Sequence, residues 1–347
     1  MPGRDLFGLP ERWGGVLTTG ATGANVVGLA AARRWWGEQH GRDVDVDGLA
    51  SLPPVPVFAS GFVHPSDTKA LAILGVGRGS IRRCSRDAAG RLDLAQLEQG
   101  LRDLDGAPSI VIGSAGEVNA GEFDPLAAMA DLTERYGAWL HVDGAFGLFA
   151  QLSPATSHLT EGIVRADSVT ADGHKWLNVP YDCGFAFVRD PALLLGTFTL
   201  FAAYLAAAEE RPSYGLRGPE SSRRARSLTV WATLRAYGRQ GYRKLIERHV
   251  ALARHLADDL ERLADVPLNI VCFRYRPPGM QDGAELDALN RRIGEVAIED
   301  GRVYFGTTTY GGRVAFRPAI LNWRTSEADV ELVAHVVREI GARLRAG

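Results

Sequence analysis

Short apolar runs alternate with segments of helical periodicity through the first two-thirds of this chain. Such alternation is typical of a mostly parallel β-sheet covered by helices on both faces. The expected strands span 55–59, 80–84, 109–113, 139–143, 168–171 and 185–188, and the expected helices span 22–36, 66–74, 94–104 and 125–136. The pattern therefore predicts an α/β fold.

A second, smaller domain is expected in the last third. The chain has 347 residues, and single hydrophobic cores seldom grow beyond about 250 to 300 residues. The segment 212–219 is rich in proline and glycine, and a long helical pattern at 220–263 follows it. Beyond this helix, strands are expected at 268–273, 303–307 and 313–316, and helices at 285–298 and 327–345. We therefore expect a large domain at 1–218 and a small C-terminal α+β domain at 219–347.

Composition excludes several kinds of partner. The 39 lysine and arginine residues nearly balance 41 aspartate and glutamate residues, so no broad charge attracts nucleic acid or anionic lipid. The uncharged segment 192–208 is short for a bilayer span and is expected to pack inside the protein or at a subunit interface. A small-molecule partner is expected instead.

The cysteines and the N-terminus indicate a cytoplasmic protein. Cys84, Cys183 and Cys272 are odd in number and widely spaced, with no C-x-x-C pair or metal-ligand spacing. The first residues lack the apolar run and cleavage site of a signal peptide. We expect no metal, no secretion and a reducing compartment.

One pair of segments carries the chemistry. His141-Val142-Asp143 ends an expected strand, and Asp172-Gly173-His174-Lys175 follows the next one, so both segments are expected at the same edge of the sheet. The amine of a lysine condenses with an aldehyde to a Schiff base, and a buried carboxylate keeps a pyridine nitrogen protonated. Lys175 and Asp143 therefore suit a pyridoxal 5'-phosphate site, although a lysine is more often a surface charge and Asp143 could cap a helix.

A turn of small residues leads into the first long helix. Thr18 to Asn25 place glycine, alanine and threonine where free amides and the helix dipole favour an anion. The alternative is an ordinary helix start with Thr22 as the N-cap. Ser66 and Lys69 match an S-x-x-K motif whose partner motifs are absent, so we expect Ser66 to be a helix N-cap.

Together these segments resemble the group II pyridoxal-phosphate amino-acid decarboxylases, the family of the aromatic amino acid, tyrosine and glutamate decarboxylases. The resemblance runs from about Gly15 to the last helix. Its motifs are Thr19-Gly20-Ala21-Thr22-Gly23-Ala24-Asn25, the segments 115–125, 141–147 and 167–176, Ser222-Arg223-Arg224-Ala225-Arg226 with Trp231, and the segment 316–322. The resemblance implies the fold type I transferase fold, an amino-acid substrate and a homodimer with the active site at its interface.

The resemblance also implies which residues hold the cofactor. Lys175 would form the Schiff base, and Asp143 would pair with the pyridine nitrogen. Ala145 would pack on one face of the ring, and His64, also a catalytic candidate, would stack on the other. The implied phosphate ligands are Ala21, Thr22 and His174.

The resemblance also implies residues that act on the substrate, and each of these assignments has an alternative. Arg317 resembles an arginine near the substrate carboxylate, but it could also serve a structural ion pair. His64 could be only a turn residue before Pro65. Tyr214 is a candidate for the loop tyrosine that assists protonation, with Tyr204 as the alternative. Arg223, Arg224 and Arg226 are expected to form an ion-pair cluster at a helix start.

The expected reaction is decarboxylation of an L-amino acid to its amine, with Lys175 as the covalent anchor. Three departures from the family bear on this. Glu117-Val118 replace a pair of threonines, and Gly144 and Phe146 alter the aspartate motif. The substrate preference of better-known members therefore cannot be assigned to this chain. Only about 17 residues precede the phosphate turn, fewer than in the family. Alternative hypotheses are therefore transamination, oxidative deamination to an aldehyde, or a catalytically silent truncated subunit.

Overall fold

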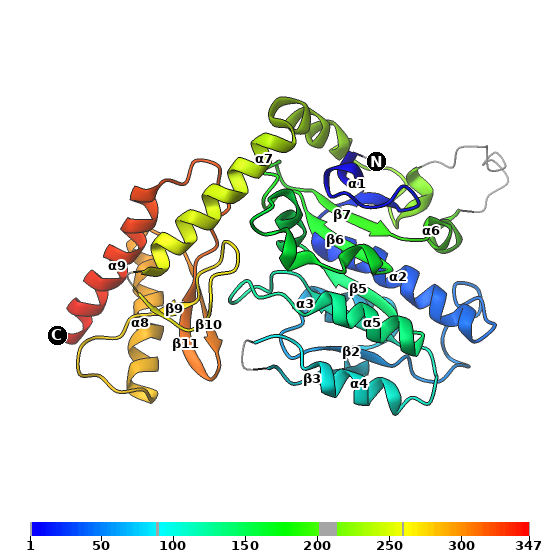
Figure 1. Ribbon diagram of the computed structural model, residues 1–347, viewed down its shortest axis with the longest axis horizontal. Helices are drawn as coiled ribbons and strands as arrows, with labels where there is room; N and C mark the ends of the chain where they lie inside the picture. The colour runs from blue at the N-terminus through cyan, green and yellow to red at the C-terminus, as the bar shows by residue number, and fades with distance from the viewer. Residues whose placement is uncertain (1, 88–89, 201–213, 259, 347) are drawn as a thin grey trace. The chain divides into compact units, whose positions relative to one another are not determined.

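The computed structural model describes residues 2–87, 90–200, 214–258 and 260–346 (Figure 1). Its contacts divide the chain into two compact units. Unit 1 holds residues 1–115 and 123–242, and unit 2 holds residues 116–122 and 243–347. This division falls inside a helix, after the predicted boundary at 218, and the assignment of domains as folding units stays a prediction.

Unit 1 contains a seven-stranded sheet with the strand order β1-β7-β6-β5-β4-β2-β3. Strands β2 to β6 pair in parallel, whereas β7 runs antiparallel to both β6 and β1. This confirms the predicted α/β fold with a mostly parallel sheet. The strands are β1 (Gly14–Thr18), β2 (Val57–Ser60), β3 (Ile81–Cys84), β4 (Ile110–Ser114), β5 (Trp139–Asp143), β6 (Ser168–Asp172) and β7 (Gly184–Val188).

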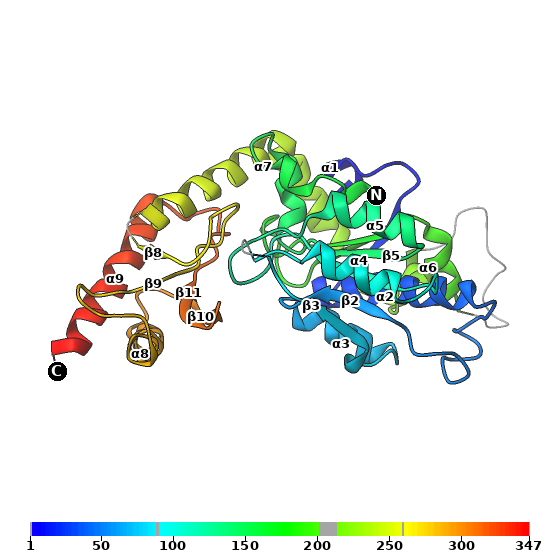
Figure 2. The ribbon, with the colours of Figure 1, turned by 60° about the horizontal axis from the view of Figure 1, so that its bottom comes forward.

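Helices cover both faces of this sheet (Figure 2). One face packs against α2 (Ala21–Gln39), α3 (Pro65–Ile73) and α6 (Pro191–Phe198). The other packs against α4 (Leu94–Arg102) and α5 (Leu126–Tyr136). Alternate side chains of a strand point to opposite faces. In β2, Val57 and Ala59 join the core under α2 and α3, whereas the Phe58 ring lies against Gly100 of α4.

The apolar segment that begins at Ala192 contributes to the core of unit 1. Leu193 and Leu194 of α6 are buried among residues of α2 and the sheet, which confirms the predicted interior packing for this part. Residues 201–208 lie outside the described residues. Among the described residues, no helix combines the length and the apolar character that a bilayer span requires.

Strand β1 lies outside the strands expected from the sequence. It begins with Gly14 and Gly15, and glycine has a low strand propensity. The structure gives the reason for a glycine at position 15: a Cβ there would lie 2.1 Å from the carbonyl oxygen of Ala186 in β7. The close approach of β1 to β7 therefore requires a residue that strand prediction disfavours.

Unit 2 is built on a four-stranded antiparallel sheet with the order β10-β11-β9-β8. A long helix, α7 (Arg226–Asp258), ends in this unit and is interrupted at Gly238, whose φ is 60°. It starts later and ends earlier than predicted, and β8 occupies the end of the predicted helix. The other elements are β8 (Glu261–Arg262), β9 (Phe273–Arg274), α8 (Ala284–Asp300), β10 (Gly306–Tyr310), β11 (Arg313–Arg317) and α9 (Glu327–Ala346).

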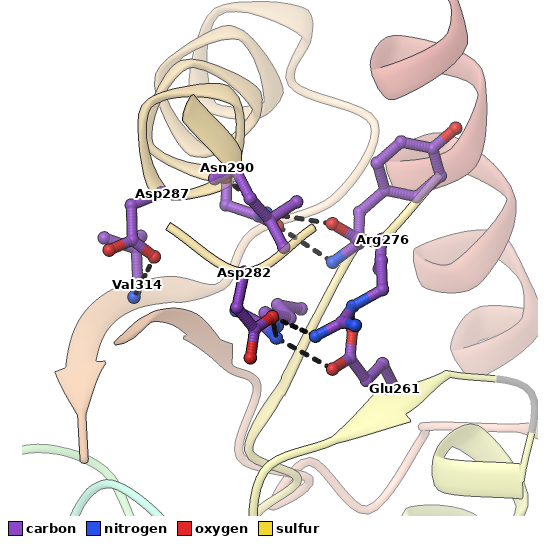
Figure 3. A network of polar contacts seen from close by, with 9 residues as sticks. Glu261, Arg276, Asp282, Asp287, Asn290 and Val314 are labelled. Atoms are coloured by element: carbon purple, nitrogen blue, oxygen red, sulfur yellow. Dashed lines mark hydrogen bonds and ion pairs between the residues drawn. The ribbon is translucent and has the colours of Figure 1, made fainter. Parts of the chain in front are cut away.

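Polar side chains join α8 to the sheet of unit 2 (Figure 3). Asn290 is fully buried, and its amide donates to the carbonyl of Tyr275 at 2.9 Å while its oxygen accepts from the Tyr275 amide at 2.8 Å. Asp287 accepts from the amide of Val314 at 2.9 Å. Arg274 and Arg276 both pair with Glu261 and Asp282. The contacts of Asn290 and Asp287 join α8 to backbone groups of Tyr275 and Val314, and the ion pairs link β8 and β9 to the segment before α8.

Replacing Asn290 with alanine is predicted to destabilise unit 2 by about 2 to 4 kcal/mol, because two partly buried backbone groups of Tyr275 lose their partners. Urea unfolding followed by circular dichroism measures this change. Arg291→Ala, an exposed position on the same helix, is the control and should change stability by less than about 0.5 kcal/mol. Equal effects of the two variants would contradict the structural role of Asn290.

Candidate active site

The carboxyl ends of several strands of unit 1 lie at one edge of its sheet. Strand β5 ends at Asp143, and the neighbouring parallel strand β6 ends at Asp172, three residues before Lys175. Strand β2 leads to His64 at the start of α3, and β1 leads through Gly20 into α2. In open α/β sheets this edge is where ligand-binding groups collect.

The alternation of side chains along β5 and β6 selects which residues face α2 and α3. Trp139 belongs to the core on that face, so His141 and Asp143 point the same way. On β6, Ser168 contacts His141, Thr170 contacts Asp143, and Asp172 contacts the first amide of α2. Polar side chains are thus gathered on one side of the sheet, next to two helix N-termini.

Asp143 is a buried carboxylate with several hydrogen-bond donors. Its Oδ1 accepts from the amide of Ala145 at 3.0 Å and from the hydroxyl of Thr170 at 3.4 Å. Its Oδ2 accepts from the side-chain amide of Asn25 at 3.1 Å. Burial alone would raise the pKa of Asp143, but the charge of Lys175 and these donors outweigh it and leave the pKa lowered. The side chain is therefore ionised although it lies at the protein interior.

A chain of hydrogen bonds runs from Trp139 through Ser168, His141 and Asn25 to Asp143. The indole N–H of Trp139 can only donate, and it binds the Ser168 hydroxyl at 3.0 Å. The side-chain oxygen of Asn25 can only accept, so Nε2–H of His141 donates to it at 3.3 Å. A neutral imidazole carries one N–H, so Nδ1 of His141 accepts from the Ser168 hydroxyl at 2.7 Å. Burial lowers the pKa of His141 to about 4, which keeps the ring neutral. The chain fixes the amide of Asn25 with its N–H groups toward Asp143.

A branch of this network reaches His64. The second N–H of Asn25 binds the Ser66 hydroxyl at 3.0 Å, and that hydroxyl lies 2.6 Å from Nδ1 of His64. The Ser66 amide also donates to His64 Nδ1, at 3.2 Å. His64 is the N-cap of α3, so the prediction of Ser66 as the cap is wrong. Ser66 instead occupies the first turn, where Pro65 takes the position that needs no amide.

Lys175 lies between acidic and aromatic groups. Its Nζ is 3.5 Å from Oδ2 of Asp172 and 3.9 Å from the centroid of the Phe146 ring. The side chain is about one-fifth exposed, at 22 %, so the amine is held in place and still accessible. Phe146, one of the two departures in the aspartate motif, thus packs directly against the lysine.

The N-terminus of α2 carries an anionic group from the protein itself. Asp172 Oδ1 accepts from the amide of Ala21 at 2.9 Å, and Thr22 is the next residue of the first turn, whose amide has no carbonyl partner inside a helix. The N-cap is Gly20 with φ 157°, so the alternative of Thr22 as the cap is wrong. A Cβ at Gly20 would lie 3.3 Å from Cε1 of His174, which explains the need for glycine there.

His174 joins this turn to the segment before β7. Its Nδ1 lies 3.2 Å from Asp172 Oδ1 and 3.1 Å from the carbonyl of Cys183. The imidazole stacks on Tyr181, with ring centroids 4.0 Å apart. Burial raises the pKa of Asp172, partly offset by the charges of Lys175 and His174. Asp172 is therefore easier to protonate than an ordinary aspartate.

The residues predicted to contact the substrate or donate the proton have no described contact with Lys175 or Asp143. Tyr214 begins η5 (Tyr214–Arg217), is half exposed, and contacts Arg217 and Arg223. Tyr204 lies outside the described residues. Arg317 belongs to unit 2, where Nη1 donates to the carbonyl of Val118 at 3.3 Å. The roles of Tyr214 and Arg317 stay predictions.

The residues that depart from the family pattern at 117–118 have a structural explanation. The Glu117 carboxylate accepts from the amides of Asn119 and Ala120 and from the Asn119 side chain. Its charge thus stabilises its own turn. The predicted arginine ion-pair cluster is confirmed for two of its three members: Arg226 makes a two-pronged pair with Asp182 at 2.9 and 3.0 Å, and Arg224 lies 3.9 Å from the same carboxylate. Arg223 instead donates to the backbone carbonyls of Glu220 and Tyr214.

Fold and site together define an enzyme of the fold type I class that uses pyridoxal phosphate. The model of the pyridoxal-dependent decarboxylase conserved domain matches residues 4–276, and the chain belongs to this family. It is a pyridoxal-phosphate-dependent amino-acid decarboxylase, which confirms the predicted family, cofactor and reaction class.

Known relatives cover almost the whole chain. An aromatic-L-amino-acid decarboxylase from Bacillus atrophaeus is 30 % identical over 340 residues, which cover 94 % of this chain and 68 % of the relative. A cysteine sulfinic acid decarboxylase from Mus musculus is 31 % identical over 352 residues, covering 95 % and 71 %. The crystal structure of Oryza sativa TDC with PLP and tryptamine matches with a TM-score of 0.90 at 27 % identity, covering 98 % and 74 %.

Several residues of the site were not predicted from the sequence to take part in it. Asn25 lies one helical turn after Ala21, which puts it on the same side of α2. Asp172 precedes the lysine by three residues and directly ends β6. Ser66 and Asp67 gave no signal beyond their neighbours, because serine and aspartate near a helix start usually serve as caps. Ser168 begins β6, where its sequence neighbours give no sign of its contact with His141.

We predict that acid weakens unit 1 through His141. The folded pKa of about 4 lies below the unfolded value of about 6.5, so its contribution is fully present above pH 6.5 and is lost as the pH falls toward 4. The expected loss is about 3 kcal/mol of unfolding free energy.

Urea unfolding between pH 4 and 7 measures this loss in the wild type and in His141→Gln. The variant lacks the titrating ring, so its stability should fall less across this range. The exposed His158→Gln is the control and should follow the wild type. Parallel curves for the wild type and His141→Gln would contradict the buried neutral state of His141.

Proposed function

We propose that this decarboxylase converts an L-amino acid to its amine with Lys175 as the covalent anchor of the cofactor and Asp143 as the partner of its pyridine nitrogen. The observation that carries the proposal is the ionised, buried Asp143 carboxylate beside Lys175. A carboxylate held in this state favours a positive charge on a ring nitrogen next to it. The residues present fit the group that the family uses.

The cofactor supplies one chemical property when bound: it accepts the electron pair left at Cα as carbon dioxide departs. The protein supplies position and charge. Asp143 is oriented by Asn25, Ala145 and Thr170, so its oxygen positions are set before any ligand arrives. The amine of Lys175 is held over the Phe146 ring, and its side chain is partly exposed, so the amine is accessible for covalent attachment.

The phosphate end is supported by the groups at the start of α2. The first-turn amides of Ala21 and Thr22 and the ring of His174 are the proposed ligands. Asp172 stands in for the anion, because its carboxylate accepts from the Ala21 amide. A phosphate at this turn requires Asp172 to lose its charge or move, and the raised pKa of Asp172 lowers the cost of protonating it.

The remaining roles are proposed from the family motifs. Ala145 and His64 are the proposed groups on the two faces of the ring, supported by the buried position of Ala145 after Asp143 and by the capping bond that fixes His64. Arg317 is the proposed substrate-carboxylate contact. Tyr214 is the proposed proton donor; it is half exposed, and the Arg217 guanidinium lies over its ring.

The covalent anchor can be located without ambiguity, because the chain contains only three lysines, Lys69, Lys175 and Lys244. Reduction with borohydride in the presence of pyridoxal phosphate is predicted to label the peptide that contains Lys175. Lys175→Ala should lose both the label and amine formation. Lys69→Ala and Lys244→Ala change exposed side chains and should keep both. Labelling of Lys69 or Lys244 in place of Lys175 would refute the proposed anchor.

We propose a homodimer with the active site at its interface. Leu228, Trp231 and Tyr237 are exposed apolar residues along the first part of α7, with 63, 54 and 64 % exposure. Such a run of apolar surface supports contact with a second copy. Light scattering should give twice the chain mass, and Trp231→Glu should shift it to one chain mass, whereas Leu332→Glu on α9 should not. A wild-type monomer at micromolar concentration would contradict the dimer.

We also propose a cytoplasmic location. All three cysteines are buried and free, which is typical of a reducing compartment. Fractionation of the native host with an antibody to the chain tests this, and recovery in an extracellular fraction would contradict it.

A further inference from the structure

Asp67 is a fully buried carboxyl group for which the proposed mechanism has no use. It lies in the first turn of α3 with an exposed fraction of 0 %. Among the residues that the structure describes, none donates a hydrogen bond to either carboxyl oxygen of Asp67. An isolated charge in such a place is costly, since transfer of a carboxylate out of water is opposed by several kcal/mol unless it is paired.

No neighbour of Asp67 provides a positive charge that could pair with it. His141 Nε2 is 3.7 Å from Oδ1 of Asp67, but its N–H is directed to Asn25 Oδ1. His141 is also neutral, because burial lowers its pKa to about 4. The remaining neighbour is the carboxyl group of Asp143. Asp67 therefore faces a second acid and no cation.

Two carboxyl groups in contact inside a protein cannot both ionise, so they share one proton. The surroundings decide which group holds it. Asp143 accepts from Ala145, Thr170 and Asn25 and lies near the charge of Lys175. Asp67 has none of these donors, and burial followed by the charge of Asp143 raises its pKa well above the usual range. The proton belongs on Asp67.

We propose that Asp67 is a neutral carboxylic acid that donates its O–H to the Asp143 carboxylate and thereby sets the basicity of Asp143. It is a positioning residue, since it acts through Asp143 and not on the cofactor itself. The titratable groups around this pair are His141 on β5, His64 at the start of α3 and Lys175 after β6, while α2 presents the neutral Asn25. The inference depends on the proposed function only for what Asp143 does, and the protonation of Asp67 stands apart from it.

The hydrogen bond has a direct consequence for the site. A donor on Asp143 stabilises its charged form, so removal of the Asp67 proton donor should raise the pKa of Asp143 and strengthen its hold on any proton it shares with a ligand. Asp67→Asn keeps an N–H donor and loses the titrating proton. Asp67→Leu has nearly the same shape and loses both. The two variants therefore separate the hydrogen bond from the proton.

The protonated group can be detected by infrared spectroscopy of the full-length chain labelled with ¹³C-aspartate, without added cofactor. At pH 7 the wild type is expected to show the carbonyl band of a protonated aspartic acid. This band should be missing in Asp67→Asn and in Asp67→Leu. It should persist in Asp172→Asn, which removes another buried aspartate. Because no cofactor is present, failure of the Lys175 labelling experiment would leave this result unaffected.

The pH dependence of unfolding gives a second readout. Asp67 keeps its proton in the folded protein and releases it on unfolding. Its contribution to the free energy of unfolding is therefore fully present below the unfolded pKa of about 3.9 and is lost as the pH rises toward the folded pKa. As the pH rises from 5, the unfolding equilibrium constant of the wild type should rise relative to that of Asp67→Asn, by up to about tenfold per pH unit for as long as folded Asp67 keeps its proton.

Two results would overturn the inference. One is the absence of a protonated aspartate band that depends on Asp67. The other is a parallel pH dependence of unfolding in the wild type and in Asp67→Asn. If Asp67→Asn does not fold, Asp67→Leu replaces it in both measurements, because leucine introduces no unpaired polar atom at the buried position.

Discussion

The site depends on one electrostatic condition, an ionised carboxylate at the buried end of strand β5. Burial opposes the charge on Asp143, and the structure meets this cost with the charge of Lys175 and with donors from Ala145, Thr170 and Asn25. A carboxylate left without these partners would take up a proton and could not stabilise a positive ring nitrogen. The elements that deliver the partners are therefore those that the fold must position accurately.

The sheet delivers them through two simple regularities. Parallel strands end at the same edge, which brings Asp143 and the segment of Lys175 together from neighbouring strands. The period of two along β5 then turns His141 and Asp143 toward the same helices. Helix α2 meets them with Asn25, whose three hydrogen bonds connect His141, Asp143 and Ser66. Replacement of any one partner changes the donors available to the others.

Part of this arrangement was predictable because several strands of unit 1, such as β4 and β7, are mostly apolar. The range expected for β5, 139–143, equals the observed strand, and the aspartate at its end follows from that boundary. Strand β1 was not predictable, since its glycines are required by the distance to β7 and not by propensity. The strands β8 and β9 are only two residues long, too short to leave a periodic pattern.

The polar interior was the least accessible to sequence reasoning. Asp67 follows Pro65 and Ser66, a setting typical of an exposed first helical turn. The neighbouring residues in the sequence do not indicate that its side chain lies near Asp143. Burial of a charged residue type depends on contacts between α3 and β5, which are distant in sequence. The same holds for Asn25, which was visible only as the last residue of a small-residue turn.

The central claim, that Asp143 keeps the pyridine nitrogen protonated, can be measured on that nitrogen itself. Solid-state ¹⁵N spectroscopy of the enzyme loaded with cofactor labelled at the ring nitrogen should report a protonated nitrogen in the wild type. In Asp143→Asn the same nitrogen should report the unprotonated state. An unprotonated nitrogen in the wild type, or the same protonation state in both proteins, would contradict the account.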